Sequence, residues 1–310
     1  SCKQVDEQCG STMAALQIGF MDIAQGFADV VMCGGMAHMG RIPMGGDGKI
    51  DLNLRLFSDP SLLHWDFMTA MNMGLTAEKL AAMGYQREDM DAWGARSHQL
   101  AYQAQQEGFF DGEILPVDVP QADGTVKTVD KDQAVRSDAT IEDMAKLRPA
   151  FKKDGTIHAG NASPLNAGAS ALVLMDRETA EAKGIEPLAR IVSIGFAGVE
   201  PNIMGTGPVP STLRALKAAG LEASDIDYWD INEAFAVVAL YAIKELGIDP
   251  DKVNVKGGGI AIGHPLGATG GRLVGTLARI LKQEGGHYGC ATMCVGGGQG
   301  VAMIIENEAN

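Results

Sequence analysis

Residues 258–267 read Gly-Gly-Ile-Ala-Ile-Gly-His-Pro-Leu-Gly, and residues 294–300 read Cys-Val-Gly-Gly-Gly-Gln-Gly. The first stretch places His264 in a glycine-rich turn, and the second places Cys294 one residue ahead of three consecutive glycines. Glycines allow backbone N–H groups to come close to a developing oxyanion. A histidine and a thiol in such backbone have the parts needed for covalent acyl chemistry on a thioester.

A second reactive-looking cysteine lies near the start of the chain, where Cys9 precedes Gly10 and an apolar-periodic stretch. A helix N-terminus lowers the pKa of a thiol through the helix dipole and free N–H groups. Taken alone, most cysteines of this kind are small buried residues, and a lone histidine in a loop is most often held by backbone. Read together, Cys9 is the candidate nucleophile, His264 keeps it ionised, and Cys294 moves a proton.

Asn232 and Glu233 stand between an expected strand and an expected helix. One interpretation is that Asn232 is simply the N-cap of that helix. The alternative is a side chain that holds a water or a carbonyl oxygen near the reacting groups.

Composition excludes several classes of function. A net charge of -14, with no basic stripe, argues against nucleic-acid binding. The 5 cysteines do not form a disulfide framework and fit a reducing compartment, so we expect a cytoplasmic protein, with an organellar origin left open. No apolar run approaches the about 20 residues of a membrane span. The cysteines and histidines lack the spacing of metal ligands, so no metal and no redox cofactor is expected.

The pattern along the chain predicts an α/β fold with a parallel-rich sheet covered by helices. Short β-branched runs predict strands over residues 189–194, 227–231, 253–255, 289–295 and 301–306. Apolar-periodic segments predict helices over residues 74–83, 87–107, 210–219, 232–246 and 270–281.

A weak internal repeat suggests two similar α/β halves, with chance similarity of Gly/Ala-rich segments as the alternative. In each half a helix that begins near Cys9 or His264 leads into a strand. We assign residues 1–40 and 157–186 to the first half, 41–156 to an inserted loop domain, and 187–310 to the second half. Only eight residues precede Cys9, so we expect the first half to be incomplete, completed by a longer chain or by a second polypeptide.

With these motifs in view, the chain resembles thiolases of the acetyl-CoA acyltransferase type over essentially its whole length. The matching stretches are Cys9-Gly10-Ser11, Leu147-Arg148-Pro149-Ala150-Phe151, Ala159-Gly160-Asn161-Ala162-Ser163, Met204-Gly205-Thr206-Gly207-Pro208-Val209-Pro210, Asn232-Glu233-Ala234-Phe235-Ala236, 258–267 and 294–300.

The resemblance implies roles for individual residues. Cys9 would attack the 3-keto carbon of a 3-ketoacyl-CoA and form an acyl-enzyme, with CoA as a substrate and no other cofactor. Cys294 would protonate the departing acetyl-CoA carbanion and deprotonate the incoming CoA thiol. His264, with a water held by Asn232, would form one oxyanion hole, and the backbone N–H groups of Cys9 and Gly296 the other. The resemblance also implies substrate contacts from Ser193, Met73, Asn72 and Phe235.

The resemblance further implies a subclass and partners. Asn72 replaces a histidine typical of acetoacetyl-CoA-specific thiolases, and together with residues 40–44 this resembles degradative thiolases of fatty-acid β-oxidation. Homodimers or homotetramers, and association with a β-oxidation hydratase or dehydrogenase, are implied as well. In a departure from the family, Asp6 and Glu7 precede Cys9, and their charges could raise its pKa.

Other functions stay open from the sequence. A ketoacyl synthase would resemble a Cys-His-His site, whereas here Asn232 and a second cysteine stand in those places. An acetoacetyl-CoA thiolase of biosynthetic type would use the same residues on a shorter substrate. A non-catalytic thiolase-like lipid-binding protein, or an inactive fragment, would form no acyl-enzyme.

Overall fold

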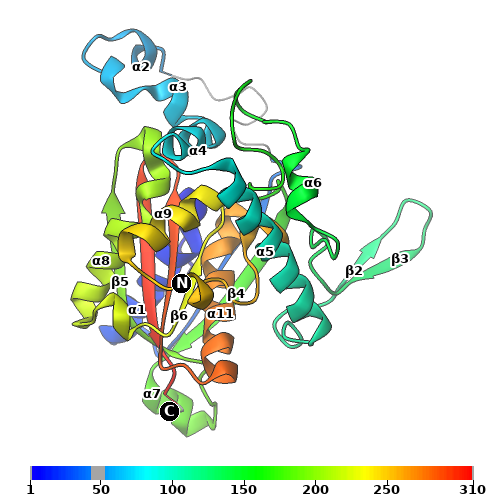
Figure 1. The fold of residues 1–310 in the computed structure, drawn as a ribbon. Helices are drawn as coiled ribbons and strands as arrows, with labels where there is room; N and C mark the ends of the chain where they lie inside the picture. Colours follow the sequence, from blue (N-terminus) through cyan, green and yellow to red (C-terminus); the bar gives the residue numbers. More distant parts are fainter. Residues whose placement is uncertain (1, 43–52, 309–310) are drawn as a thin grey trace.

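The computed structural model describes residues 2–42 and 53–308, in which two β-sheets enclose a pair of helices and a third, two-stranded sheet stands apart from them (Figure 1). The larger sheet has the strand order β5-β8-β7-β6. Its strands are β5 (Arg190–Gly198), β6 (Tyr228–Ile231), β7 (Tyr288–Val295) and β8 (Gln299–Glu306). The smaller sheet pairs β1 (Val30–His38) with β4 (Ala167–Met175) in antiparallel register.

The expectation of a parallel-rich sheet is wrong for the described strands. In the larger sheet only β6 and β7 run parallel, whereas β8 is antiparallel to both β5 and β7. The reason is the glycine turn after Cys294, where Gly297 (φ 79°) and Gly298 (φ 86°) are left-handed. A turn this tight joins neighbouring strands as a hairpin, because a parallel connection needs a dozen residues or more.

Two helices fill the space between the sheets. They are α1 (Ser11–Ala24), which continues the 3-10 turn η1 (Gln8–Gly10), and α11 (Leu266–Glu284). Their apolar side chains, including Met13, Leu16 and Leu273, form one core with β7 and β8. Because both faces of the larger sheet are buried, β7 and β8 are apolar at almost every position.

The other face of the larger sheet is covered by α8 (Pro208–Ala219) and α9 (Ala236–Leu246). Successive residues of β7 point to opposite faces, so Met293 joins the core with α1 and α11, while Cys294 joins the core with α9. The layers therefore place the end of β7 between two packed cores.

The internal repeat is visible in the arrangement of the elements. In each half a helix leads to a strand that pairs antiparallel with a later strand, as α1–β1–β4 and as α11–β7–β8. The two helices start side by side, since the Thr12 hydroxyl donates to the carbonyl of Gly267. The residues on which we based the catalytic site, Cys9 and His264, thus come from equivalent places in the two halves.

The smaller sheet is packed on one face only in the described part of the chain. Residues of β1 and β4 alternate between exposed and partly buried. The outward side chains include Met32, 73% exposed, and Met36, 75% exposed. The inward side chains contact α1 and α11.

The region between β1 and β4 contributes several helices along one side of this core (Figure 1). Its elements are α2 (Arg55–Ser58), η2 (Leu63–Trp65), α3 (Phe67–Ala70), α4 (Met73–Ala81), α5 (Arg87–Gln106), β2 (Val117–Pro120), β3 (Val126–Val129) and α6 (Ile141–Ala145). The hairpin β2–β3 extends away from the body (Figure 1), whereas α4 and α5 pack on α9. The assigned domain boundaries stay a prediction, and Pro43 and Met44, used for the subclass, lie outside the described residues.

The remaining elements are short connectors. They are α7 (Arg177–Lys183), η3 (Pro201–Thr206), η4 (Ala223–Asp225), η5 (Pro250–Lys252) and α10 (Gly259–Ile262). Within residues 2–42 and 53–308, no helix combines the length and apolar character that a membrane crossing needs.

Candidate active site

The two cysteines singled out from the sequence lie close together. Cys9 sits in η1, directly ahead of α1, and Cys294 sits near the end of β7. Both are buried, and the charge of Cys9 acts on the pKa of Cys294 and raises it further. Two thiols from distant parts of the chain therefore share one site.

The pKa of Cys9 differs from the expectation. Burial raises it to about 11, although backbone hydrogen bonds from Gly296 and Cys9 act in the opposite direction. Burial rather than the charge of Asp6 or Glu7 causes the rise, because desolvation disfavours the thiolate. At neutral pH the free protein therefore holds Cys9 as a thiol, ready to give up its proton during attack.

The backbone around Cys9 is suited to binding an oxyanion. The N–H of Gly296 points at the Cys9 sulfur, where it lowers the thiol pKa. A Cβ on Gly296 would lie 2.3 Å from Oε1 of Gln8 and 3.5 Å from Sδ of Met73. Gln8 itself has φ 50°, a left-handed conformation that is uncommon for a residue other than glycine. A side chain at position 296 would therefore displace the Gln8 side chain, and Met73 lies beside this position, although its contact with substrate stays a prediction.

The histidine and asparagine singled out from the sequence are also brought together. The amide nitrogen Nδ2 of Asn232 lies 3.3 Å from Nε2 of His264, and Asn232 is fully buried. Its carbonyl oxygen Oδ1 is buried and accepts no hydrogen bond from the described residues. Asn232 is not a helix cap, since α9 begins at Ala236 with Phe235 in the N-cap position.

The tautomer of His264 follows from its other nitrogen. Nδ1 lies 2.7 Å from the hydroxyl of Thr269, and that hydroxyl donates to the carbonyl of Pro265 at 3.0 Å. A carbonyl can only accept, so the Thr269 hydroxyl accepts from Nδ1–H and leaves the lone pair on Nε2. Burial and the charge of Arg272 lower the pKa of His264 to about 3, which keeps the ring neutral.

A second contact fixes the backbone of His264. Its N–H donates to Oδ1 of Asn166 at 3.1 Å. The preceding Gly263 has φ 104°, and a Cβ there would lie 2.2 Å from Nδ2 of Asn166. Neither Thr269 nor Asn166 was predicted as a contact of His264, and only the position of Thr269 in the first turn of α11 was a usable signal.

Phe235 reaches the same region from the loop between β6 and α9. It forms an isolated antiparallel bridge with Ala162, and Ser163 N–H donates to the carbonyl of Ala234 at 3.0 Å. Its ring meets that of Phe151 edge to face at 6.1 Å between centroids. The segments around residues 151, 162 and 235, which we matched to one family, are therefore neighbours in space.

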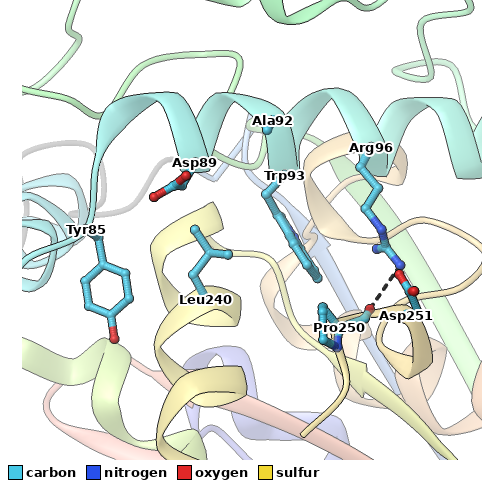
Figure 2. Close-up of a pocket in the computed structure, with 8 residues that line it drawn as sticks. All are labelled: Tyr85, Asp89, Ala92, Trp93, Arg96, Leu240, Pro250 and Asp251. Atoms are coloured by element: carbon cyan, nitrogen blue, oxygen red, sulfur yellow. Dashed lines mark hydrogen bonds between the residues drawn. The ribbon is translucent and has the colours of Figure 1, made fainter. Parts of the chain in front are cut away.

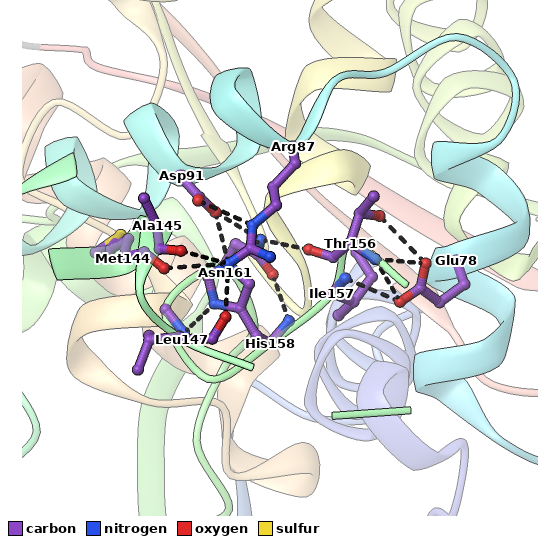
Figure 3. Close-up of polar contacts among 11 residues, drawn as sticks. Glu78, Arg87, Asp91, Met144, Ala145, Leu147, Thr156, Ile157, His158 and Asn161 are labelled. Carbon is purple, nitrogen blue, oxygen red and sulfur yellow. Dashed lines mark hydrogen bonds and ion pairs between the residues drawn. The ribbon is translucent and has the colours of Figure 1, made fainter. Parts of the chain in front are cut away.

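A buried polar network holds the loop that carries Ala162 (Figure 3). Asn161 Nδ2 donates to Asp91 Oδ1 at 2.9 Å, and Nε2 of His158 lies 2.8 Å from the same oxygen. Gly160 N–H donates to Nδ1 of His158 at 3.1 Å, so Nε2 carries the ring proton. Burial lowers the pKa of His158, which favours the neutral ring. The ring then accepts from the loop at Gly160 and donates to Asp91 on α5.

Two residues assigned by resemblance stand apart from the two cysteines. Ser193 pairs with Ile304 in the interior of the larger sheet, whereas Cys294 pairs with Gly300 at its end. The Ser193 hydroxyl donates to the carbonyl of Ala215 on α8 at 2.8 Å. Asn72 is the exposed N-cap of α4 and accepts from Leu75 N–H at 3.2 Å. The structure thus gives Ser193 and Asn72 structural contacts and does not bring Ser193 to the site.

A cluster of charges lies behind the site. Arg272 forms an ion pair at 3.0 Å with Asp230, two residues before Asn232. Burial raises the pKa of Asp230 to about 6 and that of Asp132 to about 6. In the part of the chain that the structure describes, no group of three or more His, Cys, Asp or Glu side chains is arranged to hold a metal ion.

Comparison with known families gives matches along nearly the whole chain. The family model "Thiolase, N-terminal domain" matches residues 1–178, and "Thiolase, C-terminal domain" matches residues 185–307. The 3-ketoacyl-CoA thiolase of Chromohalobacter salexigens is 47% identical over 97% of this chain and 76% of that protein. The 3-ketoacyl-CoA thiolase of Marinobacter nauticus is 46% identical over 99% of this chain and 78% of that protein.

Solved structures give the same result. The human mitochondrial 3-ketoacyl-CoA thiolase superposes with a TM-score of 0.86 at 37% identity, covering 98% of this chain and 78% of that one. The Bacillus anthracis acetyl-CoA acetyltransferase superposes with a TM-score of 0.85 at 40% identity, covering 97% of this chain and 78% of that one.

Proposed function

This chain belongs to the thiolase family and is an acetyl-CoA C-acyltransferase, and we propose that its acyl transfer proceeds through Cys9, His264, Asn232 and Cys294. The reaction is the thiolytic cleavage of a 3-ketoacyl-CoA in fatty-acid β-oxidation, or the reverse condensation. One observation supports this assignment of residues. Cys9 and Cys294 are two buried thiols that lie close enough to affect each other, and the N–H of Gly296 reaches Cys9. The neutral ring of His264 contacts Asn232.

In the first step the sulfur of Cys9 attacks the 3-keto carbon, and its proton passes to Nε2 of His264. A thiol with a pKa near 11 needs such an acceptor, and a neutral imidazole with a free Nε2 can supply it. The charge that develops on the 3-keto oxygen would be bound by the backbone N–H groups of Cys9 and Gly296.

In the second step the bond between C2 and C3 breaks, and the electron pair moves into the acetyl-CoA enolate. His264, now carrying the proton on Nε2, can donate to the thioester oxygen. The unpaired Oδ1 of Asn232 supports a bound water as the second donor, because a buried acceptor of this kind calls for a partner. Cys294 then gives its proton to C2, and acetyl-CoA leaves.

In the third step Cys294, left as a thiolate, removes the proton from the thiol of an incoming CoA. The CoA sulfur attacks the acyl group on Cys9, and the Cys9 thiolate is expelled and takes back a proton from His264. Burial raises the pKa of Cys294 above that of an ordinary thiol, which makes it a weak acid and, once ionised, a strong base.

Intact mass before and after brief exposure to a 3-ketoacyl-CoA tests these roles. Acetoacetyl-CoA and a longer 3-ketoacyl-CoA should each be tried, since we expect the inserted region 41–156 to set the chain length that is accepted. We expect an acyl adduct that Cys9→Ala removes and that Cys2→Ser keeps, because Cys2 is exposed whereas Cys9 and Cys294 are both buried. An adduct that persists in Cys9→Ala contradicts the assignment of the nucleophile.

A biosynthetic acetoacetyl-CoA thiolase is the second candidate, favoured by the similarity to the Bacillus anthracis acetyl-CoA acetyltransferase. It predicts an adduct from acetoacetyl-CoA alone. We further propose a homodimer or homotetramer with CoA as the substrate carrier and no other cofactor, which sedimentation and activity after chelation would test. The cytoplasmic location and the association with other β-oxidation enzymes stay predictions.

A further inference from the structure

Glu233, next to Asn232, is a fully buried carboxylate that accepts four hydrogen bonds. Oε1 accepts from Nε1 of Trp93 at 2.9 Å and from Nδ2 of Asn254 at 2.8 Å. Oε2 accepts from the hydroxyl of Ser97 at 2.6 Å and from the backbone N–H of Ile260 at 3.1 Å. Both oxygens are thus surrounded by donors, which is the arrangement that makes a buried carboxylate tolerable.

The four donors come from two separate parts of the chain. Trp93 and Ser97 lie on α5, and Asn254 and Ile260 lie in the segment that ends at His264. Ser97 strengthens the connection, since its hydroxyl also accepts from Gly258 N–H at 3.1 Å. The Glu233 carboxylate, next to Asn232 in sequence, therefore links α5 to the segment that leads to His264.

The local backbone is adapted to this carboxylate. Asn254 has φ 51°, and its side chain accepts from Ile231 N–H at 2.8 Å and donates to the Ile231 carbonyl at 2.9 Å. A Cβ on Gly258 would lie 2.4 Å from Cδ of Glu233. A strained asparagine and a glycine forced by contact indicate a position that its surroundings specify closely.

The outer end of the connection reaches the surface at a cavity of about 420 Å³ (Figure 2). There Arg96 stacks on the Trp93 ring at 4.8 Å, and its Nη2 donates to the carbonyl of Pro250 at 3.1 Å. Burial lowers the pKa of Arg96, and the charges of Glu233 and Asp251 oppose that effect in part. Trp93 thus contacts both charged groups, with its indole N–H on Glu233 and its ring under Arg96.

We propose that Glu233 is a positioning residue that holds Asn232 and the segment before His264 in the arrangement that binds the thioester oxygen. The proposal rests on the function proposed above for Asn232 and His264. A neutral side chain of the same shape would keep the packing but leave hydrogen-bond donors unpaired. Asn232 and the segment before His264 would then no longer be held in one position relative to each other. The enolate step would slow, whereas the environment of Cys9, built from η1 and β7, would not change.

The test compares Glu233→Gln with Glu78→Gln. Glu78 is a matched control, because it is a buried glutamate that accepts from the backbone N–H groups of Thr156 at 2.9 Å and Ile157 at 2.9 Å (Figure 3). For Glu233→Gln we expect kcat to fall about 10- to 100-fold, with KM within about threefold and the rate of Cys9 alkylation within about twofold. For Glu78→Gln we expect a lower Tm and a kcat within about twofold of the wild type.

A wild-type kcat in folded Glu233→Gln overturns the proposal. So does a fall of kcat that is matched by an equal fall in the alkylation rate, because that indicates general loosening. Should Glu233→Gln fail to fold, Trp93→Phe removes one of the four donors, and we expect kcat to fall about three- to tenfold. An unchanged kcat in Trp93→Phe then overturns it. The acyl adduct on wild-type Cys9, measured in parallel, reports on the proposed function alone.

Discussion

Nδ2 of Asn232 lies 3.3 Å from Nε2 of His264, while Oδ1 of the same buried amide accepts no hydrogen bond from the described residues. A buried acceptor left without a donor costs about 1–3 kcal/mol. The buried amide of Asn232 therefore lowers the stability of the fold. It also lies next to Nε2 of His264, the ring nitrogen that can accept a proton. Such a site is arranged for a substrate or a water rather than for the core.

Asn232→Ala should therefore lower activity more than stability. We expect kcat for thiolysis to fall about 100-fold, as for the loss of one oxyanion-hole donor, with little loss of Tm because an unsatisfied group is removed. Steady-state kinetics with acetoacetyl-CoA and thermal unfolding check the two halves of this prediction. A large drop in Tm with an unchanged kcat would mean that Asn232 serves the fold.

The reactivity of Cys9 should depend steeply on pH. Because burial raises its pKa to about 11, the thiolate fraction grows about tenfold per pH unit from neutrality upward. The rate of alkylation by iodoacetamide, followed by peptide mass in a Cys2→Ser background, should rise across this range. A rate that is already constant above about pH 7 would instead indicate a standing thiolate–imidazolium pair.

Much of this site was predictable because its chemistry is local in sequence. Cys9 and His264 each stand next to a glycine, and Cys294 lies two residues before Gly296, whose backbone N–H reaches the Cys9 sulfur. The helices and strands of the second half follow from simple periodicity, for example α11 around an apolar stripe that includes Leu273 and Leu277. The end of α9 at Leu246 was also predictable, since Gly247 is left-handed at its C-cap.

The rest depended on contacts between distant residues. The strand expected over 253–255 is only a pair of isolated bridges, because Asn254 turns its side chain to Ile231 in place of a continuing ladder. Strand direction was missed because periodicity carries no information on pairing partners. The pKa of Cys9 was missed for a similar reason: a helix N-terminus is visible in the sequence, whereas burial under β7 is not.

The contact between β1 and the start of α11 should tolerate no side chain. A Cβ on Gly35 would lie 1.8 Å from the carbonyl oxygen of Gly267. Since that atom is backbone at the start of the helix after His264, we expect Gly35→Ala to destabilise the fold by about 3 kcal/mol and to reduce activity. Gly198→Ala is the control, because a Cβ there meets no atom within 4 Å. Chemical denaturation would compare the two, and equal stabilities would refute the packing argument.

Asp132 should make stability depend on pH. Burial raises its pKa to about 6 from 3.8, so the folded state holds the proton more tightly than the unfolded state. Its contribution is complete below about pH 4 and is lost as the pH rises through about 6. The stability of Asp132→Asn relative to the wild type should therefore rise between about pH 4 and about pH 6 and level off above that range. Asp59→Asn should show the opposite sign, because hydrogen bonds from Ser61 and Arg55 lower the pKa of Asp59. A constant difference between Asp132→Asn and wild type contradicts the prediction.

Thr269 should control which nitrogen of His264 carries the proton. Its hydroxyl donates to Pro265 and accepts from Nδ1–H at 2.7 Å, which leaves Nε2 as the base. Thr269→Val removes that acceptor while keeping the shape, so the ring can adopt the tautomer with the proton on Nε2. We expect kcat to fall about tenfold with KM little changed, because a misplaced proton acts only when Cys9 must be deprotonated. Thr269→Ser keeps the hydroxyl and should restore kcat. A Thr269→Ser enzyme as slow as Thr269→Val would attribute the loss to the packing of the methyl group, and the tautomer assigned to His264 would have to be abandoned.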